Sequence, residues 1–367
     1  MKINEIVLKN EERVSLRLRE LYRSFGYTQY KMSKFEEYDL YARNKDFLIS
    51  DNVITFTDTN GKLMALKPDV TLSIVKNTKV GEGLRKVYYD ENVYRVSGGS
   101  HAYREIAQTG LECIGDVDDY AIAEVLMLAA ESLSRISDDY VLDVSELDIV
   151  SAVIDSFGVD GETRAALLVA VGEKNLHTVS AIASEVGVPA EKSELLRSLM
   201  DLQGNGDAAI AALRAMLADT AAMPAVERLA RIMAALKKAG CDSKIRIDFS
   251  VVDDMNYYNG IVFKGFVNGV PTGVLSGGQY DRLMKKMGKQ TGAIGFAVYL
   301  DLLERLHDSA ENYDVDVLML YNDKMPAAAL LEKANAVVKA GESVLMRTAV
   351  PADLRYKRLI DLTKGEC

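Results

Sequence analysis

The sequence predicts an α+β fold in which an antiparallel sheet is flanked by helices. Two pairs of strand-like runs, each joined by a turn or a polar loop, predict β-hairpins. Residues 158–248 contain no Phe, Tyr or Trp and are rich in Ala, Leu, Glu and Arg, which is typical of a helical insertion. Runs of β, α and β character within residues 315–350 predict a short α/β segment near the end of the chain.

The N-terminal part begins with a helix and a tight hairpin. Residues 11–25 have apolar side chains at helical spacing, and Gly26 follows them as a helix C-cap. Residues 53–66 alternate around an Asn-Gly turn at Asn60, the sequence type that favours a two-stranded hairpin. A helix followed by a hairpin is therefore expected before residue 70.

A second, longer hairpin is predicted from residues 87–95 and 104–115, which a polar loop separates. A period of two places one set of side chains of the second strand on one face: Arg104, Ile106, Gln108, Gly110 and Glu112. The other face then carries Ala107, Thr109, Leu111 and Cys113. A carboxylate buried without a partner costs several kcal/mol or has its pKa raised. A cationic, hydrogen-bonding ligand is therefore expected beside Glu112.

Strand character returns after the insertion. Residues 245–254, 257–267 and 272–278 are strand-like, and residues 294–306 predict a strand that runs into a helix. The final run, residues 351–362, mixes basic, acidic and apolar side chains and predicts a helix.

Three parts are predicted from this pattern. The core comprises residues 1–150 and 245–311, the helical insertion residues 151–244, and a truncated α/β module residues 312–367.

Composition excludes several classes of protein. Hydrophobic residues make up 49% and charged residues 27%, so the chain is globular. The formal charge of −10 disfavours a large nucleic-acid surface, because phosphate binding needs clustered cations. No signal peptide and no membrane span are visible, which predicts a cytoplasmic protein. The three cysteines and three histidines are scattered and predict no metal site.

Four stretches resemble the histidyl-tRNA synthetases, which are class II aminoacyl-tRNA synthetases. They are Leu66–Thr71 (LKPDVT), residues 104–115 (REIAQTGLECIG), Asn256–Phe263 (NYYNGIVF), and Ser276–Leu283 (SGGQYDRL) followed by Gly295–Ala297 (GFA). The double Tyr followed by Gly and by Val-Phe is the most specific of these motifs. The resemblance implies a class II antiparallel sheet and a dimer formed through the region of the N-terminal helix.

The resemblance also implies a histidine pocket. Asp69 and Thr71 would bind the α-ammonium group, and Arg95 would face the carboxylate. Gln108 would reach the main-chain groups of the ligand, and Glu112 would accept a hydrogen bond from the imidazole N–H. Tyr258 would pack on the ring, with Tyr257 in a mainly structural role.

The positions at which this family binds ATP differ. Ser97 stands where the family has a Glu that contacts adenine, and Ile106 where it has a stacking Phe. Ala102 and Leu302 replace arginines, Tyr299 replaces a glycine, and Asp253 stands in place of the catalytic Arg. A carboxylate beside a polyphosphate is repulsive, so synthetase activity is not expected.

A histidine pocket without ATP contacts resembles the regulatory subunits of ATP phosphoribosyltransferase. In that family the subunit is non-catalytic, activates a short catalytic subunit, and mediates feedback inhibition by histidine at the first step of histidine biosynthesis. No cofactor, no metal and no tRNA are expected. A self-dimer within a hetero-oligomer is expected. Two alternatives stay open: a divergent histidyl-tRNA synthetase, and a paralogue that senses another amino acid.

Overall fold

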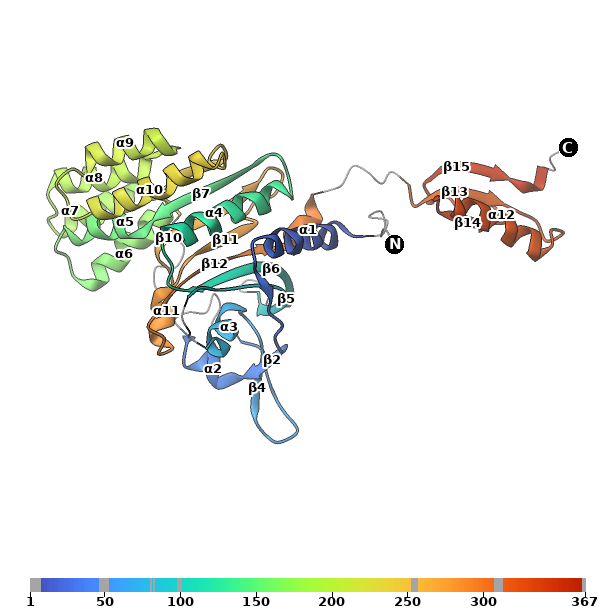
Figure 1. Cartoon of the computed structure of the whole chain (residues 1–367), viewed down its shortest axis with the longest axis horizontal. Coiled ribbons are helices and arrows are strands. Elements are labelled where there is room, and N and C mark those ends of the chain that lie inside the picture. The colour runs from blue at the N-terminus through green and yellow to red at the C-terminus, as the bar shows by residue number, and fades with distance from the viewer. Residues whose placement is uncertain are drawn as a thin grey trace. The chain divides into compact units, whose positions relative to one another are not determined.

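A computed structural model describes residues 8–45, 53–79, 81, 83–97, 101–251, 257–306 and 313–364. The chain divides into two compact units, Met1–Leu306 and His307–Cys367, and the colours of Figure 1 follow the chain through both. Each unit is built around a sheet of its own. The division follows Leu306, shortly before residue 311, where the sequence predicts the end of the core.

The larger unit contains a nine-stranded sheet. Its strands are β1 (Thr28–Gln29), β5 (Arg85–Val96), β6 (Tyr103–Gly115), β7 (Tyr140–Glu146), β8 (Gln203–Asn205), β9 (Ile245–Asp248), β10 (Asn259–Val267), β11 (Leu275–Gln279) and β12 (Gly292–Tyr299). They lie in the order β1-β5-β6-β12-β11-β10-β7-β9-β8. The six strands from β5 to β7 are antiparallel to one another, so the predicted antiparallel sheet is confirmed.

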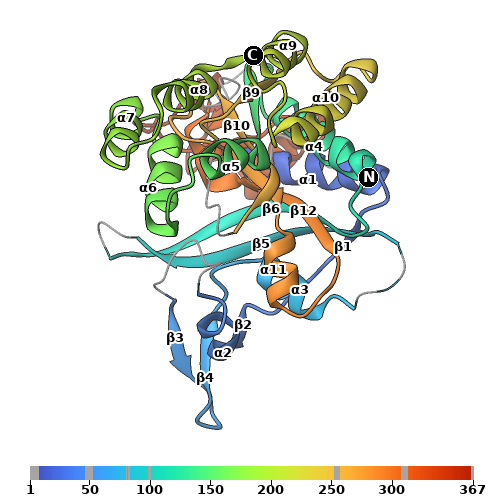
Figure 2. The same cartoon turned by 90° about the vertical axis from the view of Figure 1, so that its left-hand side faces the viewer.

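Both predicted hairpins are present. β3 (Thr55–Thr57) pairs with β4 (Leu63–Leu66), and β2 (Phe35–Glu37) adds to the other edge of β4 to form a small separate sheet. β5 pairs with β6 over their whole length, which brings Arg95 opposite Arg104. Figure 2 shows the long β5–β6 hairpin crossing the molecule above the small sheet.

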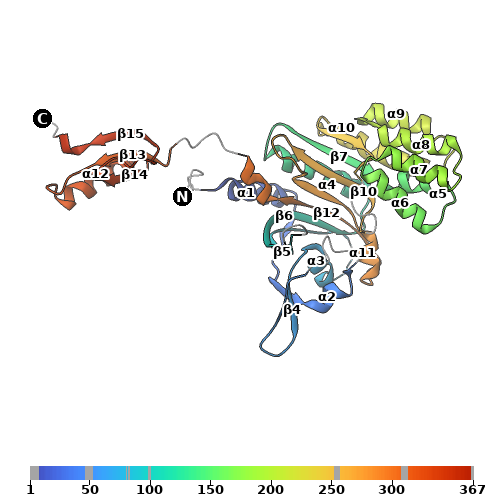
Figure 3. The same ribbon diagram turned by 180° about the vertical axis from the view of Figure 1, so that it is seen from behind.

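Helices cover the two faces of the large sheet unequally. One face carries α1 (Asn10–Ser24), α4 (Asp119–Ser134) and α5 (Leu147–Asp155). The other carries the small sheet with α2 (Tyr38–Ala42), α3 (Thr71–Asn77) and α11 (Asp281–Lys286). Figures 2 and 3, seen from different sides, show the same two layers around the strands.

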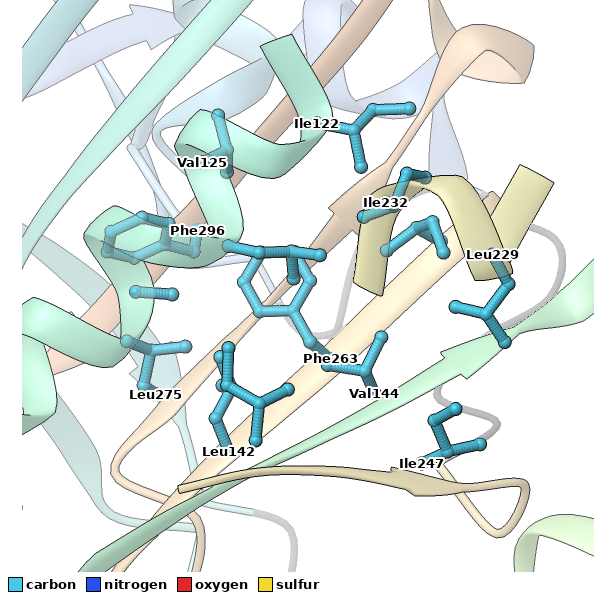
Figure 4. Packing of buried hydrophobic residues seen from close by; sticks show 14 of the residues in the cluster. Ile122, Val125, Leu142, Val144, Leu229, Ile232, Ile247, Phe263, Leu275 and Phe296 are labelled. Carbon is cyan, nitrogen blue, oxygen red and sulfur yellow. The ribbon is translucent and has the colours of Figure 1, made fainter. Parts of the chain in front are cut away.

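The main core lies between the sheet and the first set of helices. Phe263 of β10 and Phe296 of β12 meet edge to face, with ring centroids 6.1 Å apart. Figure 4 shows them among aliphatic side chains of the same sheet and of α4. Leu111 and Cys113 of β6 belong to this core, whereas Glu112 points to the opposite face, as the period of two predicts.

Five helices fill most of the predicted insertion, between β7 and β9. They are α6 (Gly161–Gly172), α7 (Leu176–Glu185), α8 (Ala190–Asp201), α9 (Gly206–Met216) and α10 (Met223–Lys238). Their buried leucines and valines belong to the same hydrophobic cluster as the main core. β8 joins the edge of the sheet by pairing with β9. The helices therefore extend the larger unit and do not form a unit of their own.

The smaller unit contains β13 (Val315–Leu320), α12 (Ala327–Lys339), β14 (Val344–Arg347), β15 (Tyr356–Asp361) and the short 3₁₀ helix η4 (Leu362–Lys364). The predicted β-α-β pattern is confirmed, with β14 parallel to β13. The helix predicted for residues 351–362 is wrong, because β15 pairs in parallel with the free edge of β13 and brings Leu359 opposite Leu318. Residues of mixed polarity fit either period, and here strand pairing decides.

Another difference follows β12. The sequence predicts a helix there, and the structure has a six-residue 3₁₀ helix, η3 (Leu300–Arg305), in place of an α-helix. Within the described part of the chain, no helix combines the length and apolar character needed to cross a membrane.

Candidate functional site

A cavity of about 450 Å³ lies on the face of the large sheet that carries Glu112. This volume is within the range of roughly 300–1,000 Å³ found for small-molecule sites. Its walls come from β5, β6, β10, β11, β12 and the start of α3. The structure brings together here every residue that the sequence assigns to a histidine pocket: Asp69, Thr71, Arg95, Gln108, Glu112, Tyr257 and Tyr258.

Glu112 is the most deeply buried of these residues, with 2% of its surface exposed. The Thr71 hydroxyl donates to its Oε1 at 2.7 Å, and the Tyr280 hydroxyl donates to its Oε2 at 2.6 Å. Burial raises the pKa of Glu112 to about 8, because the two hydroxyl hydrogen bonds only partly offset the loss of water. The negative charge of Asp69 raises this pKa further. Near neutral pH the side chain is therefore mostly protonated.

Two glycines make room for the side chains of the cavity. A Cβ on Gly295 of β12 would collide with Oε2 of Glu112 and with the carbonyl oxygen of Leu111. A Cβ on Gly278 of β11 would lie 2.8 Å from Cδ1 of Tyr258. These glycines therefore accommodate a carboxyl group and an aromatic ring, which a larger residue at either position would displace.

Asp69 stands just before α3 and has a partly structural role. Its Oδ1 accepts a hydrogen bond of 2.8 Å from the backbone N–H of Leu72, in the first turn of the helix. Burial raises the pKa of Asp69, and the backbone N–H of Leu72 and the charge of Arg95 oppose this rise. Thr71, expected to bind an α-ammonium group, directs its hydroxyl to Glu112.

Arg95 and Gln108 lie on the two neighbouring strands of the long hairpin. The Nε of Arg95 donates to the carbonyl oxygen of Pro68 at 3.0 Å, which holds the guanidinium group beside the loop that carries Asp69. Gln108 is 4% exposed and lies opposite Tyr299 of β12. The hairpin therefore places a cation and a neutral amide on the cavity wall.

The two tyrosines that precede β10 differ in their surroundings. Tyr257 is buried and packs against Tyr258 and Tyr280, with ring centroids 4.6 and 5.9 Å away. Tyr258 is half-buried and also contacts the small cluster of Leu147, Val251 and Val262. Tyr257 therefore lies deeper than Tyr258.

The further residues that line the cavity include four with polar side chains that the sequence did not suggest as ligand contacts: Tyr89, Lys264, Tyr280 and Tyr299. A signal was present for three of them. Tyr89 is six residues before Arg95 on β5, so the two side chains lie on the same face of that strand. Lys264 is likewise two residues after Val262 on β10. Tyr280 stands within the SGGQYDRL stretch. Tyr299 was recognised only as a replacement for a glycine.

Of the described positions expected to contact ATP, Tyr299 lines the cavity, whereas Ser97, Ala102, Ile106 and Leu302 are not part of its wall. The backbone N–H of Ser97 bonds to the carbonyl oxygen of Ala102 near the tip of the long hairpin. Ile106 packs beside Tyr89 and Val93, and Leu302 of η3 packs on the main core. Asp253 lies outside the described residues. No group of side chains suited to a metal ion occurs in the described ranges.

Comparison with known proteins gives the family. A model of the histidyl-tRNA synthetase family matches residues 4–303. A protein from Caldanaerobacter subterraneus subsp. tengcongensis, named ATP phosphoribosyltransferase regulatory subunit, is 30% identical over 342 residues, which are 90% of this chain and 88% of that protein. The chain belongs to the histidyl-tRNA synthetase-like family of ATP phosphoribosyltransferase regulatory subunits.

Solved structures agree with the fold of this family. A structure described as an ATP phosphoribosyltransferase regulatory subunit/histidyl-tRNA synthetase from Bacillus halodurans has a TM-score of 0.75 at 23% identity, over 96% of this chain and 93% of that one. An ATP phosphoribosyl transferase (HisG:HisZ) complex from Thermotoga maritima matches with a TM-score of 0.62 at 16% identity, over 80% of this chain and 98% of that one. The predicted class II synthetase-like fold is confirmed.

Proposed function

We propose that this chain is the non-catalytic regulatory subunit of an ATP phosphoribosyltransferase. It would activate a short catalytic subunit and mediate feedback inhibition by histidine at the first step of histidine biosynthesis. The names of its relatives and the HisG:HisZ complex among its structural neighbours support this role. The observation that carries the proposal is that all seven predicted residues line one cavity, and that Glu112 is the most deeply buried of the seven.

Histidine suits the chemistry of this cavity. Its α-ammonium group would pair with Asp69 and its carboxylate with Arg95, the two groups of opposite charge held beside each other at the start of α3. Gln108 would contact the main-chain groups of the ligand. The imidazole ring would lie between Glu112 and Tyr258, with its nitrogen bonded to the carboxyl group and its face on the phenol ring.

A lack of synthetase activity is part of the proposal. Ser97, Ile106 and Leu302 present no cation and no aromatic face to a nucleotide, and the chain has Asp253 where the family has its catalytic Arg. Pyrophosphate exchange with histidine and ATP tests this point. Detectable exchange by the chain alone would favour the divergent synthetase.

Regulation would arise from a coupling free energy. Histidine must bind the active and inactive states of the complex with different affinities, and such differences are typically about 1–3 kcal/mol. We also infer a self-dimer through the region of α1, where Leu16 and Phe25 are exposed. A cytoplasmic location fits a partner that acts on ATP.

The test is to mix the chain with the short-form catalytic subunit of the same organism and to follow phosphoribosyl transfer to ATP. We expect the rate to rise when the chain is added and to fall again with histidine. Titration calorimetry of the chain with histidine is the companion measurement. No heat with histidine, but heat with another amino acid, would point to the paralogue with a different ligand.

A further inference from the structure

Within the described residues, the Glu112 carboxyl group accepts hydrogen bonds from neutral donors only. Thr71 donates to one oxygen and Tyr280 to the other, at 2.7 and 2.6 Å. Both hydroxyls are themselves buried, with Tyr280 at 2% and Thr71 at 8% exposure. A lysine or arginine in their place would fix the ionised carboxylate, whereas hydroxyls orient the group and leave its proton exchangeable.

The groups that face Glu112 come from each element around it. Tyr89 of β5, Tyr257 before β10 and Tyr280 before α11 are buried phenols whose pKa values are raised well above 10, so they stay neutral. Among the described residues, the charge that shifts the pKa of Glu112 is that of Asp69, which favours the protonated form, and the cations Arg95 of β5 and Lys264 of β10 line the same cavity. β12 contributes Gly295, which has no side chain to separate the carboxyl from the strand.

We propose that Thr71 and Tyr280 are positioning residues that present Glu112 as a proton partner, so that the carboxyl group and the imidazole ring of the ligand share one proton in the complex. This inference rests on histidine as the ligand of the proposed function. In the bound state the proton of the carboxyl group lies on a ring nitrogen or between the two atoms. The ring and the carboxyl group then form one hydrogen-bonded pair, and no other bond is made or broken.

The number of protons bound before and after association sets the pH dependence. Between the ordinary imidazole pKa of about 6.5 and the Glu112 pKa of about 8, the free partners together carry one proton, and binding exchanges none with water. Above this range the free carboxyl group has lost its proton, so binding must take one up. Below the range the ring is also protonated, so binding must release one. Affinity is therefore highest within the window and falls by up to about tenfold per pH unit outside it.

The experiment is titration calorimetry of the full chain with histidine from pH 6 to 9.5, repeated in buffers of different ionisation enthalpy to count protons. Glu112→Gln is the reference variant, because it shares every other titration, including that of the ligand's α-ammonium group. We expect the wild type to take up close to one proton above pH 8 and the variant to lack this uptake. The histidine affinity of the wild type divided by that of Glu112→Gln should therefore fall as the pH rises above 8.

Tyr280→Phe tests the positioning role. Loss of a donor to the carboxylate raises the Glu112 pKa, so the alkaline fall in affinity should begin at a higher pH by about half a unit or more. Thr71→Val should shift it in the same direction, and Thr71→Ser, which keeps the hydroxyl, should restore the wild-type profile. If circular dichroism shows that Tyr280→Phe folds poorly, the Thr71→Val and Thr71→Ser variants test the positioning role instead.

Two results would overturn the inference while leaving the proposed function intact. One is histidine binding whose pH profile runs parallel in wild type and Glu112→Gln. The other is an alkaline limb that neither Tyr280→Phe nor Thr71→Val displaces. Absence of histidine binding to the wild type at any pH would instead refute the proposed function itself.

Discussion

Glu112 and Asp69 are two buried carboxyl groups in one cavity, yet their surroundings differ. Asp69 accepts a backbone N–H and lies in the field of Arg95, whereas Glu112 is held by two neutral hydroxyls. Burial raises the pKa of both, but a cation opposes the rise only at Asp69. One end of the cavity is therefore arranged for fixed opposite charges and the other for a group that can gain or lose a proton.

The largest loss of histidine affinity is expected when Glu112 is replaced. Glu112→Ala removes the ring partner and leaves two buried hydroxyls unsatisfied, at about 1–3 kcal/mol for each such loss. We expect the Kd for histidine to rise by a factor of about 100 or more in titration calorimetry. Glu146→Ala is the matched control, since Glu146 is equally buried in β7, has a pKa raised to about 8, and lies outside the cavity wall. An equal loss of histidine affinity in both variants would contradict the assignment of Glu112 to the histidine site.

A smaller effect is expected from the strand beneath Glu112. In Gly295→Ala the added methyl group collides with Oε2 of the carboxyl group, so the side chain must leave its two hydroxyl partners. We expect histidine affinity to fall by roughly 30-fold, about 2 kcal/mol, together with a lower Tm. Gly204→Ala on β8, where a Cβ has no neighbour within 4 Å, should leave both unchanged. Unaltered binding by Gly295→Ala would show that the Glu112 position is unimportant.

At the opposite end, Asp69→Asn separates charge from helix capping. The amide oxygen can still accept the Leu72 N–H, but the negative charge opposite the ligand's ammonium group is lost. We expect about a tenfold loss of histidine affinity with little change in Tm. Asp69→Ala should lower both. If Asp69→Asn binds histidine like the wild type, Asp69 is a capping residue only.

The smallest effect concerns the paired tyrosines. Tyr258→Phe keeps the ring that packs beside Gly278 and removes one hydroxyl, so affinity should fall about fivefold, or roughly 1 kcal/mol. Tyr257→Phe should cost less affinity and more thermal stability, because Tyr257 is packed in the cluster behind the cavity. Affinity and Tm of the two variants, measured side by side, check the order. The reverse order would exchange their roles.

Much of the fold followed from local patterns. The Asn-Gly turn at Asn60 and the alternation along residues 104–115 predict the two hairpins and the separate faces of Gln108 and Leu111. Local patterns failed at residues 351–362, because the pairing partner of β15 is β13, some forty residues earlier in the chain. They also failed after β12, where packing of Leu302 and Leu303 against the main core accompanies a 3₁₀ turn.

The seven residues expected in the pocket followed from the resemblance to the histidyl-tRNA synthetases. Their hydrogen-bond partners were not, since Thr71, Glu112 and Tyr280 come from three separate stretches that meet only when the sheet forms. From the sequence alone, strand parity placed Gln108 and Glu112 on one face, and the family resemblance indicated the other residues that line the cavity. Only the tertiary structure decided the proton affinity of Glu112, because that depends on burial and on donors supplied by distant segments.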